Sequence, residues 1–257
     1  MIALFDSGLG GLSLLRELRG QLPAHDLAYV ADSAHCPYGP KPGEFVRARS
    51  LAIGRALERE GARALVVACN SAVASGALEA LRAELAIPVI GIEPGVKPAA
   101  ALTQTGVVGV LATARTVESD RLASLVERYA DGVEVVTQPC PGLVERVEVG
   151  LLDGPETRAL VEYYIDPLLA RGIDVLVLGS THFPFLRKLI AEVAPRVAIV
   201  DPGPAVARQV ARVVVEHSIA EGTGSVVYST TGDPALVEPV LRRLTGDPRA
   251  VVEQSAA

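Results

Sequence analysis

Four polar or reactive residues that follow apolar, strand-like stretches have counterparts in the second half of the chain. The pairs occur in the same order, at offsets of 106, 106, 111 and 108 residues: Ser7 with Thr113, Asp32 with Gln138, Cys69 with Ser180, and Glu93 with Asp201. The second pair is weak alone, but four pairs at a nearly constant offset indicate an internal duplication. The repeat constrains the fold most strongly, because it requires two similar halves.

Each half alternates short apolar stretches with longer segments of helical spacing, which indicates parallel α/β units. In the first half, a strand expected at residues 64–68 delivers Cys69, and one helix is expected from there through Leu85. We therefore expect an α/β fold of two pseudo-symmetric parallel-sheet lobes with the active site in the cleft between them. The segment after about residue 204 has no counterpart and should return to the first lobe. The expected lobes are thus 1–95 plus 206–257, and 96–205.

The composition favours a globular protein with a large core and excludes several classes of function. Of the 257 residues, 49% are hydrophobic, yet no apolar run reaches the ~18 residues of a bilayer-spanning helix. The net charge of −6 is spread along the chain and offers no basic face to nucleic acid. We expect neither a membrane nor a nucleic-acid partner. Since the N-terminus does not resemble an export signal, we expect a cytoplasmic protein.

The three cysteines, Cys36, Cys69 and Cys140, are too far apart and too few for a disulfide framework, and they fit a reducing compartment. No CxxC motif occurs, and the four histidines are not spaced from the cysteines as zinc ligands usually are. Only three lysines are available to anchor pyridoxal phosphate. The sequence therefore predicts no metal site and no cofactor.

A glycine-rich turn, GLGG at residues 8–11, follows the first expected strand. It matches part of the dinucleotide-binding fingerprint, but Ser13 stands where the third glycine would be. Its backbone N–H groups are equally suited to a carboxylate. We favour the carboxylate because Asp6 would repel a pyrophosphate placed beside it, and a nicotinamide enzyme is the least favoured alternative.

Cys69 is the strongest single candidate for a reactive group. Asn70 and Ser71 open a helix directly after it. A helix N-terminus lowers the pKa of a thiol from its usual value of about 8.5, so a thiolate is expected here. Cys36, in a loop, and Cys140, beside prolines, are expected to be packing residues.

His182 lies two residues after Ser180, at the turn that repeats the one at Cys69. This place favours a proton-transfer role over a simple surface histidine. Glu145 is the carboxylate expected to orient the imidazole. Ligands of open parallel sheets bind beyond the carboxyl ends of the strands, so Asp6, Cys69, Ser180 and His182 should meet in the cleft.

Seven motifs, spread over essentially the whole chain, resemble those of cofactor-independent glutamate racemases in the aspartate/glutamate racemase superfamily. In chain order they are FDSGLGGLS, DSAHCPYG, VVACNSA, VIGIEPGV, VGVLAT, CPGLVE and GSTHFP. The resemblance implies the two-lobed fold and a two-base 1,1-proton transfer at the α-carbon of glutamate without a cofactor. It also implies D-glutamate production for peptidoglycan by a cytoplasmic bacterial enzyme, which we expect to be a homodimer.

The resemblance implies roles for individual residues. Asp6 would assist Cys69 on one face of the substrate, and His182, supported by Glu145, would assist position 180 on the other. The first cysteine of the family works on the D-enantiomer. The positions that match those holding the carboxylates and ammonium of the substrate are Ser7, Pro37, Tyr38, Gly39, Asn70, Ser71, Thr113 and Thr181.

Position 180 departs from the family pattern, because this chain reads GSTH where the family has GCTH. An alcohol is a much weaker acid than a thiol, so Ser180 should be a poor proton donor to a carbanion. Either the serine belongs to a natural, specialised or one-sided enzyme, or it is a deliberate replacement of cysteine. We expect a glutamate racemase impaired on the Ser180 side. The alternatives are a relative that works with a single cysteine, such as an aspartate-type racemase, an isomerase or a decarboxylase, and a non-catalytic dicarboxylate-binding protein.

Overall fold

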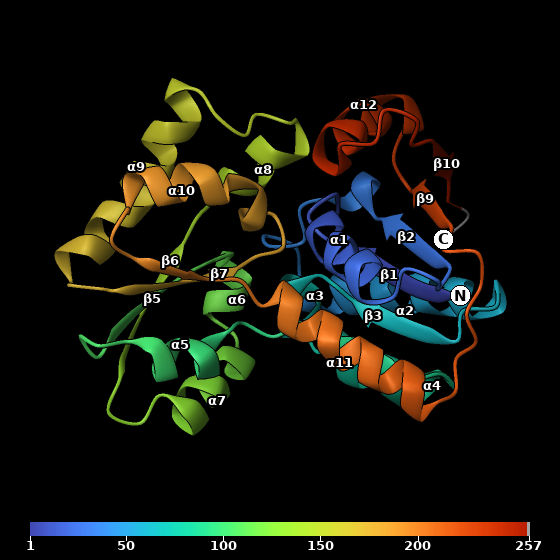
Figure 1. Cartoon of the computed structure of the whole chain (residues 1–257), viewed down its shortest axis with the longest axis horizontal. Helices are drawn as coiled ribbons and strands as arrows, with labels where there is room; N and C mark the ends of the chain where they lie inside the picture. Colours follow the sequence, from blue (N-terminus) through green and yellow to red (C-terminus); the bar gives the residue numbers. More distant parts are fainter. Residues whose placement is uncertain (256–257) are drawn as a thin grey trace.

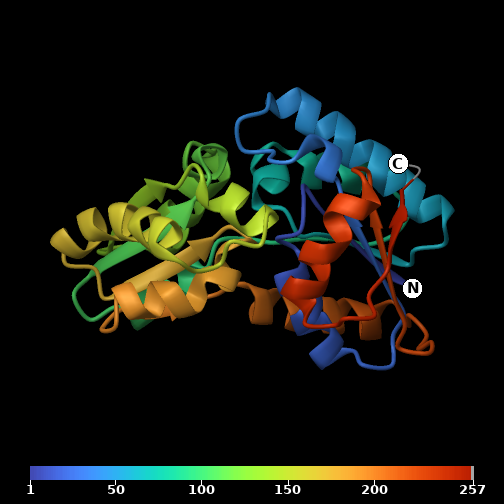
Figure 2. The same cartoon turned by 90° about the horizontal axis from the view of Figure 1, so that it is seen from above.

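Residues 1–255, which the computed structural model describes, form two lobes with one sheet each (Figure 1). The strands of the first lobe are β1 (Ile2–Asp6), β2 (Leu27–Ala31), β3 (Ala64–Val67), β4 (Val89–Gly91), β9 (Val226–Thr230) and β10 (Val252–Gln254). Those of the second lobe are β5 (Val107–Ala112), β6 (Glu134–Pro139), β7 (Val175–Gly179) and β8 (Ala198–Val200). A view turned by 90° also shows the lobes side by side (Figure 2).

The order of the strands is the same in both lobes. The first sheet runs β10-β9-β2-β1-β3-β4 and the second β6-β5-β7-β8, and every described pair is parallel. The run β2-β1-β3-β4 therefore matches β6-β5-β7-β8 strand for strand. The predicted α/β fold with two parallel sheets is confirmed, and the matching order supports the duplication inferred from the sequence.

Helices cover both faces of each sheet, as sheets of parallel strands require. Around the first sheet lie α1 (Leu12–Gln21), the 3-10 turn η1 (Ser33–His35), α2 (Gly43–Arg59), α3 (Asn70–Ala74), α4 (Ala77–Glu84), α11 (Gly203–Glu216) and α12 (Pro234–Thr245). Around the second lie α5 (Val96–Leu102), α6 (Ala114–Val117), α7 (Asp120–Tyr129), α8 (Leu143–Glu148), α9 (Pro155–Ala170), the 3-10 turn η2 (Phe183–Leu186) and α10 (Arg187–Val193). In Figure 1, α9 and α10 lie on one side of the second sheet, and α5 and α7 on the other. No helix within residues 1–255 is both long enough and apolar enough to cross a bilayer.

The central strands are fully buried, and they are apolar except for Asp6 at the end of β1, which fixes the places where they end. All residues of β1, β3 and β7 are buried. Side chains such as Leu4, Val66 and Val177 have no exposed surface, and burying each contributes about 1.5–3 kcal/mol. The residues that directly follow these strands are therefore held on a rigid support.

Two local features differ from the prediction. The single helix expected from Cys69 through Leu85 is divided into α3 and α4, because Gly76 has a φ of 78° and turns the chain between them. The short strand β10 was not expected, and it pairs with β9 at the edge of the first sheet.

The C-terminal segment lies against the first lobe. Strand β9 pairs with β2, and α11 packs against α1 (Figure 1). The boundary expected at residues 205/206 falls inside α11, so this helix begins before the boundary. The division into 1–95 plus 206–257 and 96–205 stays a prediction.

Candidate active site

One small cavity lies at the carboxyl ends of β1, β3, β5 and β7, beside the loop that follows η1. Its volume is about 10 Å³, close to the room that one water molecule needs, so the side chains that line it are closely packed. It is lined by Asp6, Ser7, Pro37, Tyr38, Gly39, Cys69, Asn70, Ser71, Thr113, Val144, Ser180, Thr181 and His182. Every residue predicted for the site is on the lining except Glu145, and Val144 is the one addition.

Cys69 and Ser180 reach the cavity from different lobes. Cys69 follows β3 and caps α3, whereas Ser180 follows β7 in the second sheet. Their exposed fractions are only 4% and 5%. A buried thiol and a buried hydroxyl thus face the same small space from equivalent positions of the repeat.

The surroundings of Cys69 favour the thiol over the thiolate, because its pKa is raised. Burial raises its pKa, and the charge of Asp6 raises it further. Hydrogen bonds with Ser7 and with the N–H of Ala72 lower the pKa, but they do not compensate. The prediction of a thiolate was wrong because α3 has only five residues and desolvation outweighs the effect of its N-terminus.

Ser7 connects Cys69 to Asp6. The Cys69 Sγ donates to Ser7 Oγ at 3.5 Å, and Ser7 Oγ donates to Asp6 Oδ1 at 3.2 Å. The other oxygen, Oδ2, accepts a 2.7 Å hydrogen bond from the hydroxyl of Thr181, which belongs to the second lobe. The fully buried Asp6 is therefore held by groups from both lobes.

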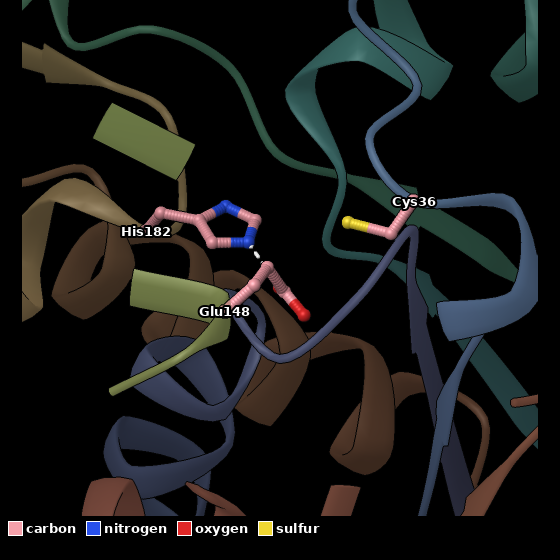
Figure 3. Close-up of side chains that lie close together, drawn as sticks. All are labelled: Cys36, Glu148 and His182. Atoms are coloured by element: carbon pink, nitrogen blue, oxygen red, sulfur yellow. Dashed lines mark hydrogen bonds and ion pairs between the residues drawn. The ribbon is translucent and has the colours of Figure 1, made fainter. Parts of the chain in front are cut away.

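Glu148, and not Glu145, is the carboxylate that contacts His182 (Figure 3). Its Oε1 lies 2.6 Å from His182 Nε2. Glu145 is exposed, and its charge acts on His182 only from a distance. The prediction was wrong because the sequence did not show which face of α8 turns inward. The helical period offered a signal, since Glu148 lies four residues after Val144, which lines the cavity.

The glycine-rich turn holds a carboxylate, but the carboxylate belongs to the protein. The N–H of Leu9 donates to Glu148 Oε1 at 2.7 Å. A Cβ on Gly8 would come within 2.2 Å of the same oxygen, and one on Gly10 within 2.4 Å of His182 Nδ1. These glycines therefore allow the first lobe to approach the acid–base groups of the second.

His182 is polarised by its contact with Glu148. Burial of the ring opposes protonation, but the hydrogen bond and charge of Glu148 outweigh it and raise the pKa of His182 above its usual 6.5. Nε2 carries the proton that Glu148 accepts. The other ring nitrogen, Nδ1, lies 3.5 Å from Ser180 Oγ. The side chains form a chain from carboxylate to imidazole to hydroxyl.

Polar groups suited to substrate carboxylates and ammonium line the rest of the cavity. Neither amide atom of the buried Asn70 has a hydrogen-bond partner within the described residues, which favours contact with a ligand. The hydroxyls of Ser71 and Thr113 lie 2.9 Å apart and join the lobes. These groups offer both donors and acceptors to a bound amino acid.

The loop that carries Pro37, Tyr38 and Gly39 is anchored from outside the cavity. The hydroxyl of Tyr38 donates to Asp32 Oδ2 at 2.5 Å, which ties this lining residue to a carboxylate outside the cavity. Arg49 donates to both oxygens of Asp32 at 2.8 and 3.1 Å. The sequence indicates no role for Arg49, because the pair forms between a turn and a distant helix.

Comparisons with known proteins show the family of this chain. The family model for Asp/Glu/hydantoin racemases matches residues 12–210. The chain is 49% identical over 253 residues to the glutamate racemase of Pseudomonas aeruginosa, which covers 97% of this chain and 96% of that protein. This chain belongs to the Asp/Glu/hydantoin racemase family.

Solved structures within the racemase family share the whole fold. The glutamate racemase isoform RacE1 of Bacillus anthracis matches with a TM-score of 0.89 and 32% identity, over 99% of this chain and 97% of that one. Escherichia coli glutamate racemase, solved with L-glutamate and the activator UDP-MurNAc-Ala, matches with a TM-score of 0.88 and 32% identity, over 99% and 98%. The resemblance to glutamate racemases seen in the sequence is therefore confirmed over nearly the full length of the chain.

Proposed function

We propose that this chain is a glutamate racemase that moves the α-proton between two faces of the substrate without a cofactor. The observation that carries the proposal is that Cys69 and the Ser180–His182–Glu148 chain enter one small cavity from opposite lobes. Glutamate is the substrate named for the relatives of this chain.

The carbanion formed at the α-carbon needs stabilisation by fixed groups, since the chemistry uses no electron-sink cofactor. We assign this role to donors that line the cavity, among them the Asn70 amide and the Ser71 and Thr113 hydroxyls. Such donors stabilise developing charge most effectively where water is excluded and no reorganisation is needed. The burial of Asn70 and Ser71 meets that condition.

On the first face, Cys69 must lose its proton before it can act as a base. We propose that Asp6 receives this proton through Ser7, whose hydroxyl contacts both the thiol and the carboxylate. The ammonium group of the substrate would favour this step, because a positive charge near the thiol lowers a pKa that burial and Asp6 have raised.

On the second face, the proton donor is the His182 imidazolium acting through Ser180. Its raised pKa favours the imidazolium, and Nδ1 faces the Ser180 hydroxyl. The hydroxyl would pass its proton to the carbanion and be reprotonated by His182. Because an alcohol is a weak acid, we propose that this side is slow and that the enzyme is impaired or one-sided.

Proton exchange in deuterated water tests the proposal. Each enantiomer of glutamate is incubated separately with the enzyme, and loss of the α-proton is followed by NMR. By resemblance to the family, Cys69 should exchange the α-proton of D-glutamate faster than the Ser180 side exchanges that of L-glutamate. Absence of exchange with either enantiomer, in this chain and in Ser180→Cys, would contradict the assignment.

The alternatives left open by Ser180, a relative that works with a single cysteine and a dicarboxylate-binding protein, are not favoured by the matches to glutamate racemases, and substrate tests separate them. Turnover of aspartate, maleate or an arylmalonate, with no exchange on glutamate, would support an aspartate-type racemase, an isomerase or a decarboxylase. Tight binding of glutamate without exchange, even in Ser180→Cys, would support a non-catalytic dicarboxylate-binding protein.

We further propose that the enzyme acts in the cytoplasm as a homodimer and supplies D-glutamate for peptidoglycan. The three free cysteines support a reducing compartment. Light scattering after size exclusion would test the dimer. Growth of a D-glutamate auxotroph would test the biosynthetic role, with Ser180→Cys as the active comparison.

A further inference from the structure

We propose that Cys36, Glu148 and His182 form a binding site for a zinc-type divalent cation beside the catalytic cavity (Figure 3). One ligand atom from each residue, a thiol sulfur, a carboxylate oxygen and an imidazole nitrogen, lies within 4.8 Å of the other two. The sequence predicted no metal site, because these residues are far apart in the chain and form no ligand motif. In this proposal Cys36, which was expected to be a packing residue, is a metal ligand.

The ligand atoms must move by roughly 1 Å to hold the ion. Zinc binds sulfur at about 2.3 Å and nitrogen or oxygen at about 2.0–2.2 Å, so the ligands of a tetrahedral site lie roughly 3.3–3.6 Å apart. The Glu148 Oε1 and His182 Nε2 atoms are 2.6 Å apart and need to separate by about 1 Å. Three protein ligands leave a fourth position for water or a carboxylate.

The first lobe provides space for the cluster at Gly8. A Cβ at this position would lie 2.2 Å from Glu148 Oε1 and 2.8 Å from the Cys36 sulfur. The N–H of Leu9 holds the same Glu148 oxygen at 2.7 Å and orients the carboxylate. A carboxylate oriented by a further hydrogen bond is typical of metal sites.

The local charge favours a cation. The cluster contains the carboxylate of Glu148, and the carboxylate of Asp6 also acts on the Cys36 sulfur. These negative groups stabilise a divalent cation placed among the three ligands. The mixed set of sulfur, nitrogen and oxygen ligands favours zinc over magnesium or calcium, which prefer oxygen alone.

Metal binding exchanges protons for the ion. Cys36 loses its thiol proton, and the proton on His182 Nε2 is replaced by the metal. A neutral His182 keeps one proton, now on Nδ1, and an imidazolium releases one to solvent. Affinity should therefore increase with pH.

Occupancy of the site would stop proton transfer on the second face, because a metal-bound His182 cannot be an imidazolium. This consequence rests on the proposed function, whereas binding itself does not. The two are therefore measured separately.

Binding is tested on the full chain after treatment with a chelator. Cobalt(II) serves as the spectroscopic probe, and zinc is then titrated in competition with a chromophoric chelator. We expect one equivalent per chain, a thiolate-to-cobalt charge-transfer band, and zinc affinity at least ~10–100-fold weaker in Cys36→Ala. Glu148→Gln gives a second measurement if Cys36→Ala does not fold, and it should also weaken binding.

Two other thiols supply the controls. Cys140→Ala removes a buried thiol outside the cluster, and Cys69→Ala removes the thiol of the cavity; both should keep the cobalt band. A band that survives in Cys36→Ala, or disappears in Cys69→Ala, would overturn the site. Exchange of glutamate α-protons with and without zinc then tests the consequence. Binding without any exchange activity would refute only the proposed function, and activity without binding would refute only the metal site.

Discussion

Replacing Ser180 by cysteine should accelerate racemisation strongly. The substituted residue is 5% exposed, lines the cavity and lies 3.5 Å from His182 Nδ1. The new thiol therefore takes a place that already has an acid–base partner. It would also stand at the position equivalent to Cys69 in the repeat.

The size of the expected rate increase follows from the absence of a thiol at position 180. A positioned general acid or base contributes about 10²–10⁴-fold to a rate, or ~2.7–5.4 kcal/mol of barrier. The original chain keeps His182 and Glu148, so part of that contribution is already present. We expect Ser180→Cys to increase kcat by about 100-fold in both directions, with little change in KM, because no group assigned to substrate binding is altered.

Circular dichroism of D- and L-glutamate solutions measures racemisation directly, and NMR in deuterated water measures exchange on each face. Ser180→Ala is the matched control, because it removes the hydroxyl that relays the proton of His182. It should lose exchange of L-glutamate while keeping that of D-glutamate. An increase of less than about threefold in Ser180→Cys, with correct folding, would refute the two-face reasoning.

Three further predictions concern the groups around the two acid–base side chains. Glu148→Gln removes the charge that raises the pKa of His182 and leaves the opposing effect of burial. The pH above which His182 no longer donates a proton should therefore fall. A pH–rate profile measures this shift, and the control Glu145→Gln should leave the profile nearly unchanged. Asn70→Ala should raise KM about 5–10-fold, as expected for one lost hydrogen bond to the substrate, with little change in Tm. A large fall in Tm would show instead that the amide is structural. Asp32→Asn breaks the buried ion pair with Arg49 and should lower the free energy of unfolding by about 3 kcal/mol, measured by urea denaturation. An unchanged midpoint would contradict the anchoring role of the Asp32 carboxylate.

The places of most site residues could be predicted from the sequence because they follow buried strands. Apolar stretches ending at Asp6, Cys69 and Ser180 locate the ends of β1, β3 and β7, and parallel sheets bring such ends to one edge. The repeat then placed the two edges face to face. Regular backbone geometry carried this part of the prediction.

Contacts between segments could not be predicted in this way. Glu145 and Glu148 both lie on α8, and only the packing of that helix decides which one reaches His182. The protonation of Cys69 also depends on tertiary structure, because desolvation and the nearby Asp6 outweigh the local effect of a helix end. Charge and burial come from neighbours in space, which the spacing of residues does not give.

The shared strand order of the two sheets bears on how the two sides of the cavity can differ. In a symmetric dimer of one ancestral lobe, each substitution would appear on both sides of the site at once, because both copies come from one gene. Fusion of two copies into one chain removes that constraint. In the present chain Cys69 and Ser180 occupy equivalent positions, yet one carries sulfur and the other oxygen. Gene fusion thus lets evolution adjust the two directions of a reversible reaction independently.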